Sequence, residues 1–283
     1  MPGTVSVVIP AHNEATVIAG ILGRLLESDP EGRLELVVAA NGCTDDTASV
    51  ARSVSPRVKV VEVSEASKIA ALNAGDAAAT SFPRVYLDAD VTVTGGTLLA
   101  LADALVDPPS IGAPRLEVDA RGASVWVRWQ YRVWELTDYR TANMVGSGLY
   151  AMSEAGRARF EAFPAVISDD GYALRLFAAA ERISLDDRTF TIRAPRTLRA
   201  FIRRQARIYA GNDQLAIAHP ELANESADGS GSALLRRIVR RPSLWLPALP
   251  YFAARIIARR RATRVRGDWT AQAWNRDEST RTG

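Results

Sequence analysis

Two aspartates, Asp88 and Asp90, follow a short run of apolar residues and could together bind a cation. The apolar run, residues 85–87, comes after Pro83 and is typical of a strand buried on both faces of a parallel sheet. Residues i and i+2 of extended backbone point to the same side, so both carboxylates would face one ligand. Oxygen ligands of this kind suit Mg²⁺ or Mn²⁺, which commonly bind together with a phosphate-bearing substrate. A solvated turn is the alternative interpretation of an isolated Asp-x-Asp motif.

Strands and helices alternate along the first 107 residues and would position these aspartates. Strands are expected at residues 5–10, 34–39, 58–63 and 84–87, and helices at residues 14–28, from about 47, 67–79 and 97–106. The short connections predict an α/β fold, with a mainly parallel, Rossmann-like sheet and helices on both faces. Ligands of such sheets bind beyond the carboxyl ends of the strands, where the two aspartates lie. Asn13 is expected to cap the first helix, and Thr44 or Asp45 the second.

The pattern changes after residue 107. A strand is expected at residues 111–118, a helix at 124–140 and a long basic helix at 197–218. The helix at 124–140 is rich in aromatic side chains, which we expect to pack in the core or against the C-terminal residues; stacking on a sugar or a lipid is the alternative. These side chains are Trp126, Trp129, Tyr131, Trp134 and Tyr139.

Composition narrows the class of protein. The chain has 283 residues, of which 47% are apolar and 24% charged, as in ordinary globular proteins. Its single cysteine, Cys43, suits a reducing compartment, and the absence of a recognisable signal peptide favours a cytoplasmic location. No Gly-x-Gly-x-x-Gly follows the first strand, which disfavours a dinucleotide oxidoreductase.

The C-terminal residues are strongly basic. Residues 229–267 contain ten arginines and no acidic residue, and a polar Gly/Ser-rich linker is expected at 224–232. The apolar stretch at 244–258 is shorter than the about 20 residues that span a bilayer. Its aromatic residues and arginines are typical of a segment at an anionic membrane surface, such as the inner face of the cell membrane. An amphipathic extension packed on the domain, or on a second subunit, is the alternative. Nucleic acid is disfavoured, because no binding module surrounds the arginines.

Five segments together resemble glycosyltransferase family 2 of the GT-A fold. They match the family in order and spacing over about residues 4–215. The segments are residues 7–14, 41–47, 68–75, 88–90, and the pair 169–170 followed by Arg175. The resemblance implies a domain at residues 1–223, with a nucleotide-sugar-binding half at 1–107 and an acceptor and catalytic half at 108–223. Residues 224–283 would form a linker and a basic, helical, amphipathic extension.

The resemblance also implies a nucleotide-sugar donor across the strand ends. Pro10, Ala11 and Glu14 would hold the nucleoside, although Glu14 could instead be a first-turn acid favoured by the helix dipole. Ala40 stands where the family has an acidic residue that reads the base, and Asn41 follows it, so the base stays open.

Basic side chains would hold the donor phosphates, and the aspartates the metal. Lys68 would favour the diphosphate, and Arg204 or Arg207 could reach the phosphates; solvent-exposed roles are the alternative for all three. Asp90 and Asp88 are the expected ligands of Mg²⁺ or Mn²⁺, with His219 as a weaker third candidate that is more often structural in such a position.

The remaining implied residues concern the transferred sugar and the proton. Residues 146–151 resemble the small-residue strand of the family, in which Gly146, Ser147 and Gly148 would leave room beside the sugar. Asp170 is expected to be the catalytic base with Asp169 as a supporting anion, and N-terminal capping of a helix is the alternative for this pair. Asn73 would either have a functional role at this motif or tie its helix to the aspartate loop.

The expected function is a metal-dependent, inverting transfer of one sugar from a nucleotide-diphosphate sugar to a hydroxyl acceptor that is lipid-linked or delivered at a membrane. A soluble enzyme acting on a small metabolite is the alternative, and a nucleotidyltransferase is a weaker one. Polymer synthesis is disfavoured, because residues 204–208 lack the Gln-x-x-Arg-Trp motif of processive relatives.

Overall fold

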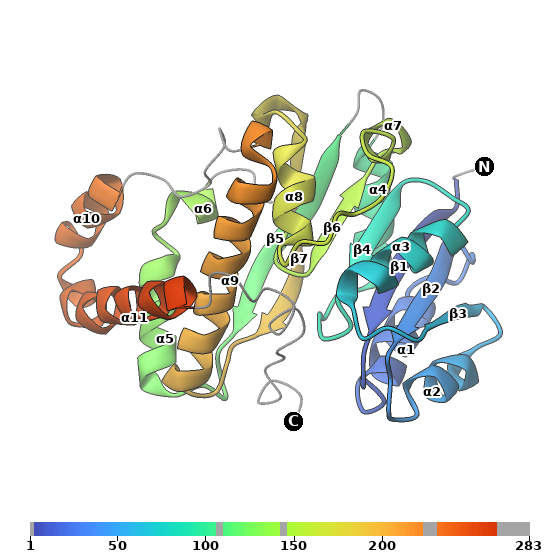
Figure 1. Ribbon diagram of the computed structural model, residues 1–283, viewed down its shortest axis with the longest axis horizontal. Coiled ribbons are helices and arrows are strands. Elements are labelled where there is room, and N and C mark those ends of the chain that lie inside the picture. The colour runs from blue at the N-terminus through green and yellow to red at the C-terminus, as the bar shows by residue number, and fades with distance from the viewer. Residues whose placement is uncertain (1–2, 106–109, 142–145, 223–230, 265–283) are drawn as a thin grey trace. The chain divides into compact units, whose positions relative to one another are not determined.

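The computed structural model describes residues 3–105, 110–141, 146–222 and 231–264 (Figure 1). These residues form two compact units. The first unit comprises residues 3–105, 110–117, 146–165 and 176–192, and the second comprises residues 118–141, 166–175, 193–222 and 231–264. The predicted boundary at residue 223 lies outside the described residues.

The first unit is built on a seven-stranded sheet with the strand order β3-β2-β1-β4-β6-β5-β7. The strands are β1 (Val5–Ala11), β2 (Leu34–Asn41), β3 (Val58–Val63), β4 (Arg84–Leu87), β5 (Ile111–Asp119), β6 (Leu149–Met152) and β7 (Arg182–Arg193). β1 pairs in parallel with β2 and with β4, and β2 pairs in parallel with β3. β6 is antiparallel to both β4 and β5. The predicted α/β, Rossmann-like fold is confirmed.

The central strands are buried because most of their side chains are apolar, on both faces of the sheet. Every residue of β1 and of β4 is buried, including Arg84 at the start of β4. Valine and isoleucine dominate β1, and their branched side chains suit a pleated strand packed on both sides.

Helices cover both faces of the sheet. The helices of this unit are α1 (Ile18–Glu27), α2 (Thr47–Val54), α3 (Lys68–Ala78), α4 (Gly95–Ala104) and α7 (Glu154–Arg157). The chain moves outward from β1 to β3 and then returns to β4 on the other side of β1. With right-handed crossovers, α3 therefore covers the face opposite to α1 and α2. The strand order reverses between β1 and β4, which makes their carboxyl ends the expected place for a ligand.

A glycine brings α3 close to the sheet. A Cβ atom added to Gly75 would lie 2.6 Å from Val8 Cγ1 on β1, so a larger residue would push the helix outward. The N-terminus of α3 is capped by Ser67, whose side chain accepts a hydrogen bond from the Ala70 backbone N–H. The predicted helix at residues 67–79 is confirmed to within one residue at each end.

Two local predictions in this unit are wrong. Asn13 does not cap α1, which begins at Ile18; Asn13 has a positive φ of 51°, and its Oδ1 accepts a hydrogen bond from the Thr44 N–H at 2.7 Å. The predicted strand at residues 146–151 begins only at Leu149. Residues 146–148 all have positive φ and form a turn, which their small side chains allow.

The second unit is helical. Its helices are α5 (Val125–Trp134), α6 (Asp138–Thr141), α8 (Asp169–Arg175), α9 (Leu198–Ala218), α10 (Gly231–Val239) and α11 (Trp245–Arg264). The predicted helix at 124–140 is thus broken between Trp134 and Asp138. Figure 1 shows α11 lying across α5 and α9, and small residues on α11 share a buried cluster with both helices. The C-terminal helix therefore packs on its own unit.

Aromatic side chains of α5 contribute to this core. Tyr131 packs edge-on against Phe201 of α9, with ring centroids 5.7 Å apart, and against Trp134 at 5.8 Å. The predicted packing role is therefore confirmed for Tyr131 and Trp134. Trp126, in contrast, is 48% exposed and contacts Trp129. Among the described residues, none of the helices combines the length and apolar character needed to cross a bilayer.

Candidate active site

The carboxyl end of β4 carries Asp88 and Asp90 beside the N-terminus of α3. Lys68, the first residue of α3, places its Nζ atom 2.8 Å from Asp88 Oδ1. The side chains of Lys68 and Asp88 are 26% and 35% exposed, and Asp90 is exposed. The structure thus brings Lys68 and Asp88 together, as the sequence predicted, and this end of the strand is open to solvent.

The turn before β6 lies against Asp88. The Asp88 backbone N–H donates to the Gly148 carbonyl at 2.8 Å. Gly148 has φ 97°, and a Cβ atom there would lie 3.2 Å from Asp88 Oδ2 and 2.9 Å from Val91. Glycine is therefore required by its backbone angle and by the space it leaves beside the second carboxylate oxygen. Gly146 and Ser147 belong to the same turn, and Ser147 also has a positive φ.

The loops after β1 and β2 form a second group at the same strand ends. Asn41 is fully buried, and its Nδ2 donates to the Ala11 carbonyl at 3.0 Å, which ties the two strands together. Glu14 is 3% exposed, and its backbone N–H donates to Thr47 Oγ1 at 2.7 Å. Pro10 and Ala11 are the last two residues of β1, and both are buried. The roles of these residues toward a nucleoside remain predictions.

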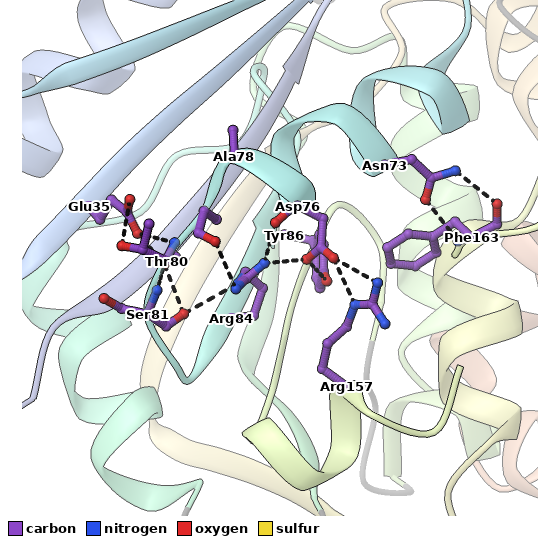
Figure 2. Close-up of polar contacts among 12 residues, drawn as sticks. Glu35, Asn73, Asp76, Ala78, Thr80, Ser81, Arg84, Tyr86, Arg157 and Phe163 are labelled. Carbon is purple, nitrogen blue, oxygen red and sulfur yellow. Dashed lines mark hydrogen bonds and ion pairs between the residues drawn. The ribbon is translucent and has the colours of Figure 1, made fainter. Parts of the chain in front are cut away.

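A buried ionic cluster, which we call the Asp76 cluster, fixes α3 to β4 (Figure 2). Asp76 Oδ1 accepts from Arg84 Nη1 and from the Tyr86 hydroxyl, each at 2.6 Å. Asp76 Oδ2 accepts from Arg157 of α7, at 2.7 Å from Nη2 and 3.0 Å from Nε. Burial, together with the neighbouring Asp76 carboxylate, raises the pKa of Tyr86 well above its ordinary value, so the phenol stays protonated and donates. The sequence reasoning missed this cluster.

The cluster positions the residues of the candidate site. Asp76 lies on the helix that begins with Lys68, and Tyr86 lies two residues before Asp88. Asn73, on the same helix, exchanges two hydrogen bonds with the backbone of Phe163, at 2.8 and 3.1 Å (Figure 2). Its predicted link to the aspartate loop is therefore wrong, because its amide is used for a different loop.

The second acidic pair lies in the second unit at the start of α8. Asp169 is 3% exposed, whereas Asp170 is half-buried. Asp170 Oδ1 accepts from its neighbour's N–H, that of Gly171, at 2.7 Å and from Ser168 Oγ at 3.1 Å. These two hydrogen bonds hold the Asp170 carboxylate in one orientation.

Helix α9 supports α8 and carries the remaining candidates. The Ile167 N–H donates to Gln214 Oε1 at 2.8 Å, which anchors the segment that precedes α8. His219, just after α9, packs against Tyr172 of α8 and lies 3.0 Å from Glu221 Oε1. On α9 itself, Arg204 is half-buried and Arg207 is exposed.

The residues at the end of β4 fit a divalent ion that is shared with a substrate. Within the described residues, no group of three or more His, Cys, Asp or Glu side chains is arranged to hold a metal. Mg²⁺ typically uses one or two carboxylates and takes its other oxygens from phosphates and water. Asp88 and Asp90, at a solvent-open strand end, provide such a donor set.

Comparisons with solved structures show the same fold. The mannosyltransferase PcManGT from Pyrobaculum calidifontis, solved with GDP-Man and Mn²⁺, is 24% identical, with a TM-score of 0.62 over 96% of this chain and 78% of that one. Glucosyl-3-phosphoglycerate synthase from Mycobacterium tuberculosis, solved with Mn²⁺, UDP and glucosyl-3-phosphoglycerate, is 20% identical, with a TM-score of 0.50 over 67% of this chain and 71% of that one. A search of curated proteins found no match.

A comparison with protein families assigns the chain. The model of glycosyl transferase family 2 matches residues 6–182, which is more than half of the sequence. The match contains β2 to β6, all but the first residue of β1, the Asp76 cluster and both acidic pairs. The resemblance seen in the sequence is thereby confirmed, and the chain belongs to glycosyl transferase family 2 and is a glycosyltransferase of the GT-A fold.

Proposed function

We propose that this enzyme transfers one sugar from a nucleotide-diphosphate sugar to a hydroxyl acceptor, with inversion at the anomeric carbon. The arrangement of Asp88, Asp90 and Lys68 at the carboxyl end of β4 carries this proposal. Open α/β sheets bind their ligands at the carboxyl ends of the strands. The two carboxylates at this place suit a metal ion, and the lysine suits a diphosphate. Membership of glycosyl transferase family 2 supports the reaction type.

Asp88 and Asp90 would hold Mg²⁺ or Mn²⁺, as Mn²⁺ accompanies the donor in the mannosyltransferase structure. When bound, the metal would neutralise the charge that develops on the leaving diphosphate. Lys68 would contribute a second positive charge there, and the half-buried Asp88 would keep its ammonium oriented. His219 remains a weaker candidate ligand, since it already contacts Glu221.

Asp170 would act as the general base. It would take the proton of the acceptor hydroxyl while the hydroxyl oxygen forms its bond to the anomeric carbon and the bond to the diphosphate oxygen breaks. The difference in burial supports Asp170 over Asp169, because a base must reach its substrate and Asp169 is 3% exposed. Asp169 would then be a supporting anion that orients the start of α8.

A lipid-linked or membrane-delivered acceptor is the class that we propose. The basic, apolar C-terminal helices support this choice. A small soluble acceptor is the second candidate, and it is favoured by the similarity to an enzyme that was solved with glucosyl-3-phosphoglycerate.

Nucleotide binding and turnover test the proposal separately. Thermal unfolding with Mn²⁺ and either UDP or GDP should show stabilisation of about 2.7 kcal/mol at 100 times the dissociation constant. Asp90→Asn should abolish this metal-dependent shift and the transfer while leaving the melting temperature of the free protein unchanged. Asp187→Asn, at an exposed aspartate of β7, is the matched control.

The base is tested by a different signature. Asp170→Asn should keep donor affinity and lower the transfer rate by about 10²-fold or more, as expected when a general base is lost. A larger loss in Asp169→Asn would exchange the two roles.

The metal site has its own contradicting outcome. Near-normal turnover of Asp90→Asn at saturating donor would refute it.

A further inference from the structure

Helix α11 is apolar on two opposite faces, and only one of them is covered. The covered face consists of Ala248, Tyr251, Ala254, Ala258 and Ala262, all of which are buried. They pack against residues of α5, α9 and α10 in two core clusters. The small alanine side chains allow α11 to lie close to its neighbours.

The opposite face carries large apolar side chains in contact with solvent. Trp245, Leu249, Phe252 and Ile256 follow one another at i, i+4, i+7 and i+11, which places them on one stripe of the helix. Their exposed fractions are 57%, 69%, 37% and 54%. We call these four residues the exposed stripe. Leu246 and Ile257, at 61% and 42%, flank it.

This arrangement is the reverse of an ordinary surface helix. A surface helix buries its large apolar residues and exposes polar ones, whereas the covered face of α11 carries four alanines and one tyrosine, and its exposed face carries tryptophan, leucine, phenylalanine and isoleucine. A contiguous exposed apolar patch on a protein usually marks an interaction site.

The charges around the stripe indicate the kind of partner. Residues 229–267 contain ten arginines and no acidic residue. Among them Arg260 and Arg261 are exposed on the last turns of α11, and Arg240 and Arg241 are exposed at the end of α10. A second copy of the chain docked symmetrically would bring these like charges together, which is unfavourable. An anionic bilayer surface offers both an apolar layer and negative headgroups.

We propose that the exposed stripe docks this enzyme on an anionic lipid bilayer, with α11 lying in the interface and the arginines contacting the headgroups. The docking does not depend on sugar transfer. Its use in delivering a lipid-linked acceptor does rest on the proposed function.

Co-sedimentation of the full chain with vesicles tests the docking. We expect binding to vesicles of phosphatidylcholine with phosphatidylglycerol, and much weaker binding to phosphatidylcholine alone. Binding should fall as salt rises, because charges are screened within about 10 Å at 0.1 M salt. Loss of nucleotide binding with retained vesicle binding would refute the proposed function but not the docking.

Two isoleucines provide a matched pair of variants. Ile256→Glu should lower vesicle binding by about tenfold or more, because it removes an inserted side chain and adds a repelled charge. Ile217→Glu, at a 68% exposed isoleucine near the end of α9, should leave binding unchanged.

Arg260→Gln tests the contribution of charge. It should lower binding to the anionic vesicles by about fivefold at low salt. Thermal unfolding should be unchanged in all three variants, since the altered side chains are exposed.

Tryptophan fluorescence provides a readout that needs no charged variant. Vesicles should shift the emission to shorter wavelength, and Trp245→Phe should remove most of the shift. The inference is overturned if the full chain ignores anionic vesicles at low salt, or if the two isoleucine variants lose binding equally. If vesicles do not bind and Ile256→Glu dissociates a dimer, a second copy of the chain covers the stripe. If vesicles do not bind and Ile256→Glu lowers thermal stability, residues 265–283 cover it. Either result also overturns the inference.

Discussion

Asp76 and Asp88 are two carboxylates of the first unit that are both paired with cations, yet their surroundings differ. Asp76 has 11% of its side chain exposed and accepts hydrogen bonds from two arginines and a tyrosine. Asp88 has 35% of its side chain exposed and pairs with the single ammonium of Lys68. Both lie along the contact between α3 and β4.

The difference separates a carboxylate that holds the fold from one that can bind a ligand. Both oxygens of Asp76 are committed to protein donors, and removing the charge would leave two arginines buried without their counter-ion. At Asp88, Gly148 leaves space beside Oδ2 and solvent reaches the side chain. The first carboxylate should therefore govern stability, and the second should govern binding.

The largest expected effect is on stability. Asp76→Asn should lower the free energy of unfolding by about 3–5 kcal/mol, as measured by urea denaturation, because it breaks a buried ionic cluster. Asp88→Asn should change it by no more than about 1 kcal/mol, because its pair is partly exposed. Equal effects of the two variants would remove the distinction.

A smaller effect is expected on binding. Lys68→Ala should weaken the affinity for a nucleoside diphosphate with Mn²⁺ by roughly tenfold, which is the typical value of one charge-assisted hydrogen bond. Isothermal titration calorimetry measures this change. Lys59→Ala, at an exposed lysine of β3, is the control and should have no effect. An unchanged affinity of Lys68→Ala would show that its ammonium serves only Asp88.

Within the Asp76 cluster, the tyrosine should matter less than the arginines. Tyr86→Phe removes one hydrogen bond but leaves both ion pairs of Asp76, so the loss of stability should be about 1–2 kcal/mol. Urea denaturation of Tyr86→Phe and Asp76→Asn side by side gives the comparison. A loss as large as that of Asp76→Asn would mean that the hydroxyl is essential to the geometry of the whole cluster.

The smallest effect concerns acid stability. Burial of Glu35 opposes its ionisation, but hydrogen bonds from Ser6 and Thr80 outweigh this and lower the pKa of Glu35 below its ordinary value of 4.5. Figure 2 shows the contact between Glu35 and Thr80. Because the folded-state pKa is lowered, Glu35 stabilises the native state above 4.5, and this contribution is lost as the pH falls. The stability difference between wild type and Glu35→Gln should therefore shrink below pH 4.5, as thermal unfolding across pH would show. A constant difference would contradict the assignment.

Sequence patterns sufficed where the signal was local. The Asp-x-Asp spacing, the apolar run before it and the lysine at the start of an alanine-rich helix identified the group at the end of β4. The strands β1, β2 and β4 were found because a strand buried on both faces is largely apolar, and β3 because four of its six residues are valines. The family resemblance added the donor and acceptor roles, which no spacing could have indicated.

Contacts between distant residues were not visible in the sequence. Asp76 and Arg157 are 81 positions apart, so no local pattern links them. The one signal is Arg84, because a charged residue at the start of a buried strand requires a buried partner. Asn13 had the residue type of a helix cap, but a hydrogen bond to Thr44 in another loop determines its conformation. Strand β7 was not predicted, because its charged residues at 186–188 interrupt the alternation of an edge strand.

The pairing of Lys68 with Asp88 also makes the enzyme suitable for chemical footprinting. Lys59 and Lys68 are the only lysine side chains in the sequence, so an amine-acylating reagent reads two side-chain sites that mass spectrometry can separate. Lys59 is exposed and supplies an internal reference for the reaction rate. Acylation of Lys68 should be slower, and a donor with Mn²⁺ should slow it further while leaving Lys59 unchanged. The ratio of the two rates would thus report occupancy of the donor site without a radioactive sugar, an acceptor or a variant protein.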